Sequence, residues 1–346
     1  MASPDLSEFD TIMEVGDLRK IISNLSAQLR QAKSKTAVFE TAVRSGVRDA
    51  ILSLGPVGPV KAPKKDKRNN DPHVALWDLG DWQGSKVTPS YNSEIMVSRV
   101  MDYCGIAEHI TDDFRSSRPI RDCTIIFGGD MVEGLFNYST QAFEIDQTIF
   151  GQYVTVSRLL VDVVRRALSI YDRVHVVPEW GNHGRIGSKR AAVPAGDNID
   201  RMCYELARQL LEGEKRLTWQ ECPTGIQRVE IGNYRALAIH GDEVGRNGYA
   251  SPQQIVTHVT KWQSGSYPWA FRDVYVHHYH NEMEFSLPNG LGSVFFNGST
   301  ESENYYALEG MAAAAVPSQR FHTIDPDRGR CASMHKVWLA EDTMAA

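Results

Sequence analysis

The sequence has 346 residues, enough for one large domain or two medium ones, and its 42% hydrophobic and 23% charged residues are typical of ordinary globular proteins. Its five scattered cysteines argue against a disulfide framework or a thiolate zinc site, and the absence of a membrane-length apolar run or a secretory signal predicts a cytoplasmic protein. The net charge of -6 argues mildly against a nucleic-acid partner, but residues 17–70 hold twelve Lys or Arg against four Asp or Glu, whereas residues 71–346 hold 25 against 35.

The apolar pattern of residues 1–53 predicts a helical arm. From Val15 onward, apolar and small residues recur with alternating spacings of three and four, which gives a helix with a narrow apolar seam. Two interpretations remain open. The seam at residues 15–47 forms a coiled coil that makes a homo-oligomer, or the helix packs on the protein's own domain.

Residues 54–72 predict a basic linker and a domain boundary. Leu54-Gly55-Pro56-Val57-Gly58-Pro59 breaks the helix, and Lys61 to Asn70 is polar, basic and without periodicity. This basic cluster either keeps the linker soluble or contacts phosphate groups.

Residues 73–346 predict an α/β domain with two sheets. Apolar runs typical of buried strands occupy residues 73–77, 124–127, 174–177, 234–239 and 273–276. Amphipathic stretches predict helices over 93–103, 149–170 and 198–211. A Pro288-Asn289-Gly290 turn between two β-rich runs predicts that the remainder forms hairpins closing the second sheet.

Each of the five apolar runs is followed by polar side chains with oxygen or imidazole donors. In chain order these are Asp81 and Gln83, Asp130, Asn182 and His183, His240, and His278 and His280. Such donors without thiolates suit Mn, Fe or Zn in a hydrolytic site. Two cations about 3.5–4 Å apart can hold an attacking hydroxide and the oxygens of a phosphate ester. The set is the right size for two ions.

The order Asp-x-Gln, Gly-Asp, Gly-Asn-His, His-Gly and His-x-His resembles the five motifs of the calcineurin-like metallophosphoesterase superfamily, especially its DNA-repair nuclease branch and phage-encoded members. The motifs run from Asp81 to His280. The resemblance implies a two-sheet sandwich flanked by helices, which makes residues 73–346 a metallophosphoesterase domain. It also implies two divalent cations, with Mn expected first and Fe, Zn or Mg as alternatives.

The resemblance also implies a role for each motif residue. Asp130 would bridge the two ions, and His183 would donate a proton to the leaving oxygen. The first ion would be bound by Asp81, His280 and Gln83, with Gln83 in the position where the family usually has a histidine. The ligands implied for the second ion are Asn182, His240 and His278.

Three residues depart from the motifs. Gln83 replaces a histidine, Gly184 replaces an acidic residue that usually orients the motif histidine, and His277 replaces a glycine. An alternative alignment makes Asp78 the first ligand. Asp81 is preferred because Asp81-Trp82-Gln83 offers two donors and Asp78-Leu79-Gly80 offers one.

Arg185 and Lys189 follow His183 closely and would either receive substrate phosphate oxygens or belong to a solvated loop. Together with the basic arm, they favour a phosphodiesterase that acts on nucleic acid. Four aromatic residues could stack on bases or belong to the core, namely Tyr138, Trp262, Tyr267 and Trp269. If a phage encodes the protein, it is expected in the host-cell cytoplasm. The alternatives are a nucleotide or cyclic-nucleotide phosphoesterase and a catalytically weak binding or scaffold protein.

Overall fold

The computed structural model describes residues 57–135, 141–187, 196–244, 250–288, 290, 292–302 and 316–340. The chain divides into two compact units, Met1–Gly55 and Pro56–Ala346, and all described residues belong to the second. The expected helical arm with its seam at residues 15–47, Tyr138 and Lys189 lie outside the described residues.

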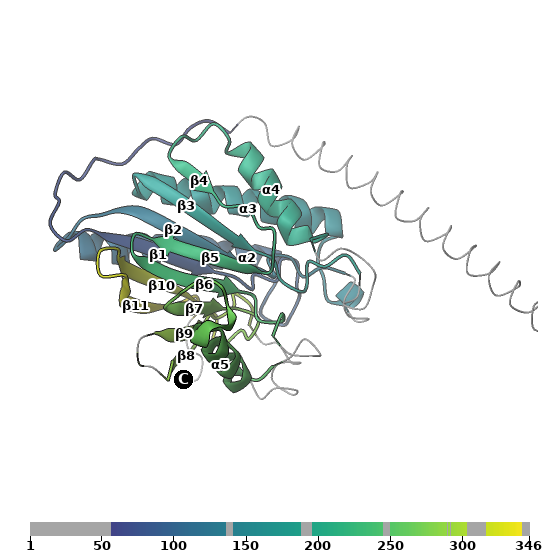
Figure 1. The fold of residues 1–346 in the computed structure, drawn as a ribbon. Coiled ribbons are helices and arrows are strands. Elements are labelled where there is room, and N and C mark those ends of the chain that lie inside the picture. Colours follow the sequence, from purple (N-terminus) through teal and green to yellow (C-terminus); the bar gives the residue numbers. More distant parts are fainter. Residues whose placement is uncertain are drawn as a thin grey trace, which may run out of the picture. The chain divides into compact units, whose positions relative to one another are not determined.

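The second unit contains two β-sheets (Figure 1). The six-stranded sheet has the order β11-β10-β1-β2-β3-β4, with β1 to β4 parallel. Its strands are β1 (His73–Leu79), β2 (Ile120–Gly128), β3 (Arg173–Glu179), β4 (Leu217–Trp219), β10 (Ser318–Asp325) and β11 (Arg330–Trp338). The five-stranded sheet has the order β5-β6-β7-β9-β8, with β6, β7 and β9 parallel. Its strands are β5 (Ile226–Ile231), β6 (Tyr234–Ile239), β7 (Asp273–Val276), β8 (Met283–Ser286) and β9 (Ser293–Phe296).

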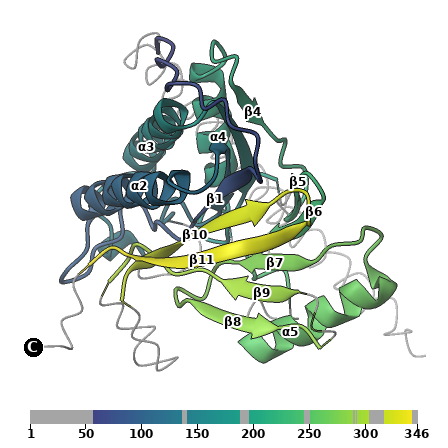
Figure 2. The ribbon, with the colours of Figure 1, turned by 90° about the vertical axis from the view of Figure 1, so that its left-hand side faces the viewer.

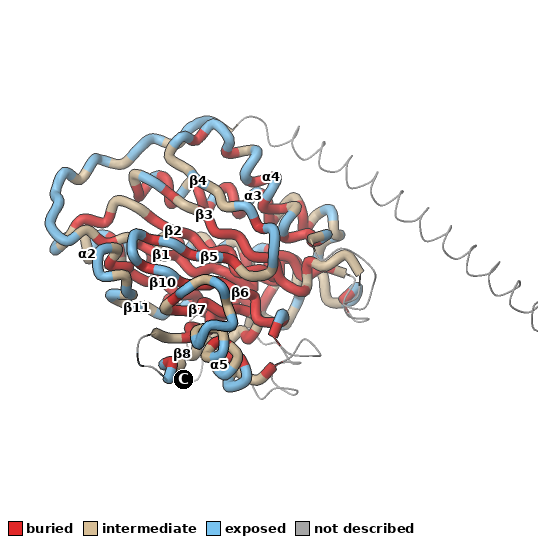
Figure 3. The backbone as a smooth tube through the Cα atoms, viewed as in Figure 1, coloured by how far each residue is buried: buried red, intermediate tan, exposed pale blue. Residues whose placement is uncertain are grey.

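The two sheets pack face to face through apolar side chains. The first sheet contributes Leu76, Ile126 and Val177, one from each of its three central parallel strands, and the second contributes residues such as Ala236 and Phe295. Figure 3 shows the same strands as the most buried part of the molecule. Burial on both faces explains why β1, β2 and β3 have continuous apolar runs and no alternation.

Helices cover the outer faces of both sheets (Figure 2). The first sheet is covered by α2 (Ser93–Arg115), α3 (Ile149–Ile170) and α4 (Ile199–Leu210), and a 3₁₀ turn (Gln141–Phe143) precedes α3. The second sheet packs against α5 (Pro252–Lys261), which continues into a π-helical turn (Trp262–Ser266). No helix within the described ranges combines the length and apolarity needed to cross a bilayer.

The predicted two-sheet α/β fold is confirmed, with one correction at the C-terminal hairpins. Only β8 and β9 extend the second sheet, whereas β10 pairs antiparallel with β1 and places β10 and β11 in the first sheet. All eight residues of β10 are buried, so this strand needs a partner on each side and cover on both faces. A position between β1 and β11 provides them.

Candidate metal centre

The polar side chains predicted from the strand ends meet at one edge of the two sheets. They follow the carboxyl ends of β1, β2, β3, β6 and β7, and the loops after parallel strands meet at the same edge. Four of them are at most 1% exposed, namely Asp81, Gln83, Asp130 and His240. Polar side chains that are buried so close together need hydrogen-bond partners or a bound cation.

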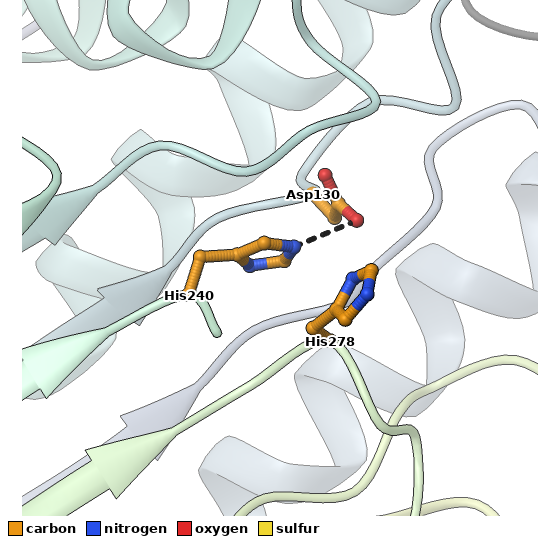
Figure 4. Close-up of side chains that lie close together, drawn as sticks. All are labelled: Asp130, His240 and His278. Atoms are coloured by element: carbon orange, nitrogen blue, oxygen red, sulfur yellow. Dashed lines mark ion pairs between the residues drawn. The ribbon is translucent and has the colours of Figure 1, made fainter. Parts of the chain in front are cut away.

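Asp130, His240 and His278 form one compact group (Figure 4). One ligand atom from each lies within 4.8 Å of the others. The Nε2 atom of His240 is 3.1 Å from Asp130 Oδ2 and 3.1 Å from Asn182 Oδ1. The Nδ1 atom of His240 donates to the carbonyl oxygen of Gly128 over 2.9 Å, which leaves Nε2 free to ligate.

Asp81, Gln83 and His280 form a second group beside the first. The Nε2 atom of His280 lies 3.6 Å from Asp81 Oδ1 and 3.3 Å from Gln83 Nε2. The Nδ1 atom of His280 lies 3.1 Å from the Oε2 atom of Glu301, which fixes the ring so that Nε2 faces the group. Glu301 belongs to none of the five motifs. It follows β9, and only the folding of the chain brings it to the site.

Asp130 lies between the two groups. Its Oδ2 atom contacts His240 of one group at 3.1 Å and the Gln83 amide nitrogen of the other at 3.5 Å. The Oε1 atom of Gln83 is buried and has no hydrogen-bond partner within the described part of the chain. Exchanging the two ends of this amide would direct its oxygen to the position of a cation ligand. Asp130, His240 and His278 could therefore hold a metal ion, and Asp81, Gln83 and His280 add oxygen and imidazole donors beside them.

Neighbouring charges and burial shift the pKa values of the site histidines in different directions. Burial opposes protonation of His240 and His280, but neighbouring carboxylates outweigh it, holding the pKa of His240 well above its usual value and raising that of His280 to about 10. Burial and the charge of His240 instead lower the pKa of His278 to about 4. Because imidazoles must lose a proton to ligate, binding of cations is expected to release protons.

His183 is held between two carboxylates. Its Nδ1 atom lies 3.2 Å from Glu133 Oε2 and 3.0 Å from the Glu133 carbonyl oxygen, and its Nε2 atom lies 3.9 Å from Asp130 Oδ2. Burial alone would lower the pKa of His183, but Glu133 and Asp130 outweigh it and raise the pKa to about 9. Glu133 thus orients the histidine in place of the acidic residue that Gly184 replaces. Its position three residues after Asp130 was a signal that sequence reasoning missed.

Asp200 is a second acidic residue that sequence reasoning missed. Its carboxylate accepts backbone N–H groups from the loops after β2 and β3, at 2.9 Å from Asp130, 3.1 Å from Met131, 3.2 Å from Val132 and 2.9 Å from Gly181. Burial and the charge of Asp130 raise its pKa to about 6. Asp200 therefore fixes the backbone of two motif loops to the first turn of α4.

Five candidate ligands have a left-handed backbone conformation. Their φ angles are 50° at Asp81, 48° at Gln83, 50° at Asp130, 74° at His278 and 54° at His280. Residues other than glycine rarely adopt this conformation, which costs on the order of 1–3 kcal/mol each. The fold thus maintains a strained backbone at the positions where the ligands converge.

Arg185 and Asp78, the aspartate of the alternative alignment, each have a partner of their own. Arg185 forms an ion pair with Asp242, a buried carboxylate two residues after His240. Asp78 does not reach the groups described above. Its Oδ1 atom lies 2.9 Å from the Nε2 atom of His277, and both residues are fully buried. This geometry favours Asp81 over Asp78 as the first candidate ligand.

No family model matches the sequence, and no curated protein is significantly similar to it. Similar solved structures include Vps29 from Entamoeba histolytica with zinc, at 12% identity and a TM-score of 0.34 over 77% of this chain and 99% of that one. Others are a metallophosphoesterase from Sphaerobacter thermophilus (12%, TM-score 0.31, 76% and 88%) and a 5′-nucleotidase from Candida albicans (9%, TM-score 0.33, 81% and 54%). The function of this chain is therefore inferred from its own side chains.

Proposed function

We propose that the protein is a metal-dependent phosphodiesterase that hydrolyses phosphodiester bonds of nucleic acid, with Mn as its preferred cation. The single observation that carries the proposal is the position of the Asp130 carboxylate, which lies between two groups of oxygen and imidazole donors. A carboxylate so placed can bridge two cations, and paired cations are a common solution for phosphoryl hydrolysis.

The candidate ligands are Asn182, His240 and His278 on one side of Asp130, and Asp81, Gln83 and His280 on the other. Bound divalent cations would supply Lewis-acid stabilisation of the phosphate oxygens and would activate water at neutral pH. The chain's own contribution is to fix the donors and to exclude water. Asp81, for example, accepts the backbone N–H of His278 at 2.9 Å, which links the loops after β1 and β7.

His183 is the candidate general acid. Its Nδ1 atom faces Glu133, so a proton at Nε2 is available on the side of Asp130, where a phosphate ester would meet the donors. Against the effect of burial, the carboxylates of Glu133 and Asp130 raise the pKa of His183, which favours the protonated ring. Protonation of the leaving oxygen by Nε2 would then complete cleavage of the P–O bond.

The proposal of a nucleic-acid substrate draws on the basic residues near the site and in the preceding chain. Arg185 is partly exposed, its guanidinium lies beside the site carboxylate Asp242, and a guanidinium can also donate to phosphate oxygens. The other stacking candidates within the described chain do not add support, because Trp262, Tyr267 and Trp269 pack against the apolar core beneath α5.

The test is an assay of the purified protein with Mn, Fe, Zn and Mg titrated separately after chelation. Its substrates are an aryl phosphodiester, an aryl phosphomonoester, single-stranded DNA and double-stranded DNA. We expect Mn to restore cleavage of the diester and of DNA. Exclusive cleavage of the monoester would replace the proposal with a small-molecule phosphoesterase, and inactivity with all four cations bound would indicate a binding protein.

A further inference from the structure

A basic pocket of about 580 Å³ lies at the amino ends of β2 and β3, beside Ile120 and Asp172. Six basic side chains line it, namely Lys64, Lys65, Lys67, Arg68, Arg115 and Arg121, against the acidic Asp66 and Asp172. The candidate metal centre follows the opposite ends of the same strands. Since β2 runs from the pocket to the metal centre and has nine residues, the two sites are separated by roughly 25 Å.

The arginines of the basic pocket hold the chain in place. Arg121 donates to the carbonyl oxygens of Asp66 at 3.1 Å and Arg68 at 2.6 Å, and Arg68 donates to the carbonyl oxygen of Arg115 at 2.8 Å. Farther along the segment, Arg216 donates to the carbonyl oxygen of Val60 at 3.0 Å. Residues 57–72 form neither a helix nor a strand. These hydrogen bonds from arginines to backbone carbonyl oxygens therefore fix the segment against the domain.

The lysines of the basic pocket are left to face solvent. Lys64, Lys65 and Lys67 are exposed, and within the described ranges no carboxylate pairs with their ammonium groups. Asp66 does not neutralise them, because it pairs with Arg68 at 2.7 Å. Three unpaired lysine side chains thus lie beside a concave surface on a fixed backbone. The rest of the chain, residues 71–346, is acidic overall.

The basic surface continues around the end of α2. A neighbouring pocket of about 520 Å³ is lined by Arg118, Arg328 and Arg330. Two carboxylates line this pocket as well: Arg118 and Arg328 pair with Asp71, and Arg328 pairs with Asp325 at 2.7 Å. Arg330 is exposed, and no acidic partner for it occurs among the described residues. Arg115, the last residue of α2, lines the first pocket, and Arg118, three residues beyond the helix, lines the second.

We propose that the basic pocket binds the phosphate backbone of a nucleic acid, at a surface separate from the metal centre. Unpaired lysines on a concave surface attract phosphates without reading a base sequence. A membrane surface is a poorer partner, because none of the large exposed apolar side chains of the described chain lines this pocket. The proposal does not depend on phosphodiesterase activity.

The test measures binding of fluorescently labelled single- and double-stranded DNA by anisotropy, in chelator, so that catalysis plays no part. The variant is Lys65→Gln/Lys67→Gln, which leaves the carbonyl contacts of Arg121 intact. The matched control, Lys261→Gln/Lys336→Gln, removes the same charge from exposed lysines elsewhere. Losing two phosphate contacts should make the salt slope of binding shallower by about 1.4 to 1.8, so the wild type should lose roughly ten-fold more affinity than the variant between about 50 and 200 mM salt.

Three results would overturn the proposal. The first is an unchanged salt slope in the Lys65→Gln/Lys67→Gln variant, and the second is an equal change in the control. The third is binding of poly-glutamate or of phosphatidylserine vesicles as tightly as DNA, which would assign the pocket to another class of partner. Normal turnover of an aryl phosphodiester by the variant is expected, and DNA binding by a protein without that turnover would leave this proposal standing while the proposed function fails.

Discussion

Gly181 packs so close to Asp130 that a Cβ atom on the glycine would overlap the Asp130 carboxylate and its backbone nitrogen. We therefore expect Gly181→Ala to displace the proposed bridging carboxylate and to abolish or strongly weaken cation binding, measured by titration calorimetry. Gly213→Ala is the matched control, since a Cβ atom there meets nothing within 4 Å. Wild-type cation affinity in Gly181→Ala would show that the position of Asp130 is not decisive.

Asp130→Asn tests the bridge with almost no change in shape. A neutral amide bridges two cations poorly, so the variant should bind fewer cations per chain and lose nearly all turnover. Cation content by elemental analysis and turnover of an aryl phosphodiester measure the two effects. Near-wild-type values for both would reject the assignment of Asp130.

His183→Ala should keep its cations while turnover falls roughly 10²- to 10⁴-fold, the usual size of a general-acid contribution. Loss of cations would instead make His183 a ligand or a structural support. Elemental analysis beside the turnover assay separates these results.

Glu133→Gln tests the cause of the raised pKa of His183. A general acid works while protonated, so activity should fall as pH rises through the pKa of His183. Without the Glu133 carboxylate this pKa should drop, and the falling limb of the pH profile should move to lower pH by roughly one unit or more. An unchanged falling limb would show that the loss of activity at high pH does not report the titration of His183.

Gln83→His should tighten binding at the group that contains Asp81 and His280. Imidazole is a better donor than an amide, and the Gln83 side chain already lies 3.3 Å from His280 Nε2. Calorimetry should resolve a stronger second binding event with activity retained. Unchanged affinity would place Gln83 outside the ligand set.

Asp78→Asn and Asp81→Asn together test which aspartate is the ligand. Asp81→Asn should lower cation binding, whereas Asp78→Asn should retain it, because Asp78 pairs with His277. Thermal denaturation provides the control for Asp78→Asn, which weakens a buried pair and should lower the Tm. Equal loss of cations in both variants would revive the alternative alignment.

The five strand ends could be predicted because buried parallel strands carry a strong sequence signal. Each is a short apolar run followed at once by polar residues, and parallel topology brings their carboxyl ends together without further information. The contacts that complete the site have no such signal. Glu301 lies 21 residues beyond His280, with β8 and β9 between them, and contacts it only in the folded chain.

Helix α2 shows why the extent of an element is harder to predict. The expected helix ended at Tyr103, but α2 continues to Arg115 with Cys104, Ala107 and Thr111 buried. Thr111 is polar and breaks the apolar pattern. In the structure its hydroxyl donates to the Ala107 carbonyl oxygen at 2.7 Å, so burial leaves it satisfied.

The left-handed backbone at Asp81, Gln83, Asp130, His278 and His280 bears on how such a centre could be engineered into another scaffold. Grafting the same side chains onto regular strand ends would aim them in other directions, because a residue's φ angle sets where its Cβ bond points. The loop conformations would have to be carried across as well, together with the Asp200 carboxylate that holds two of those loops. A transferred centre would thus need this backbone framework in addition to the candidate ligand side chains.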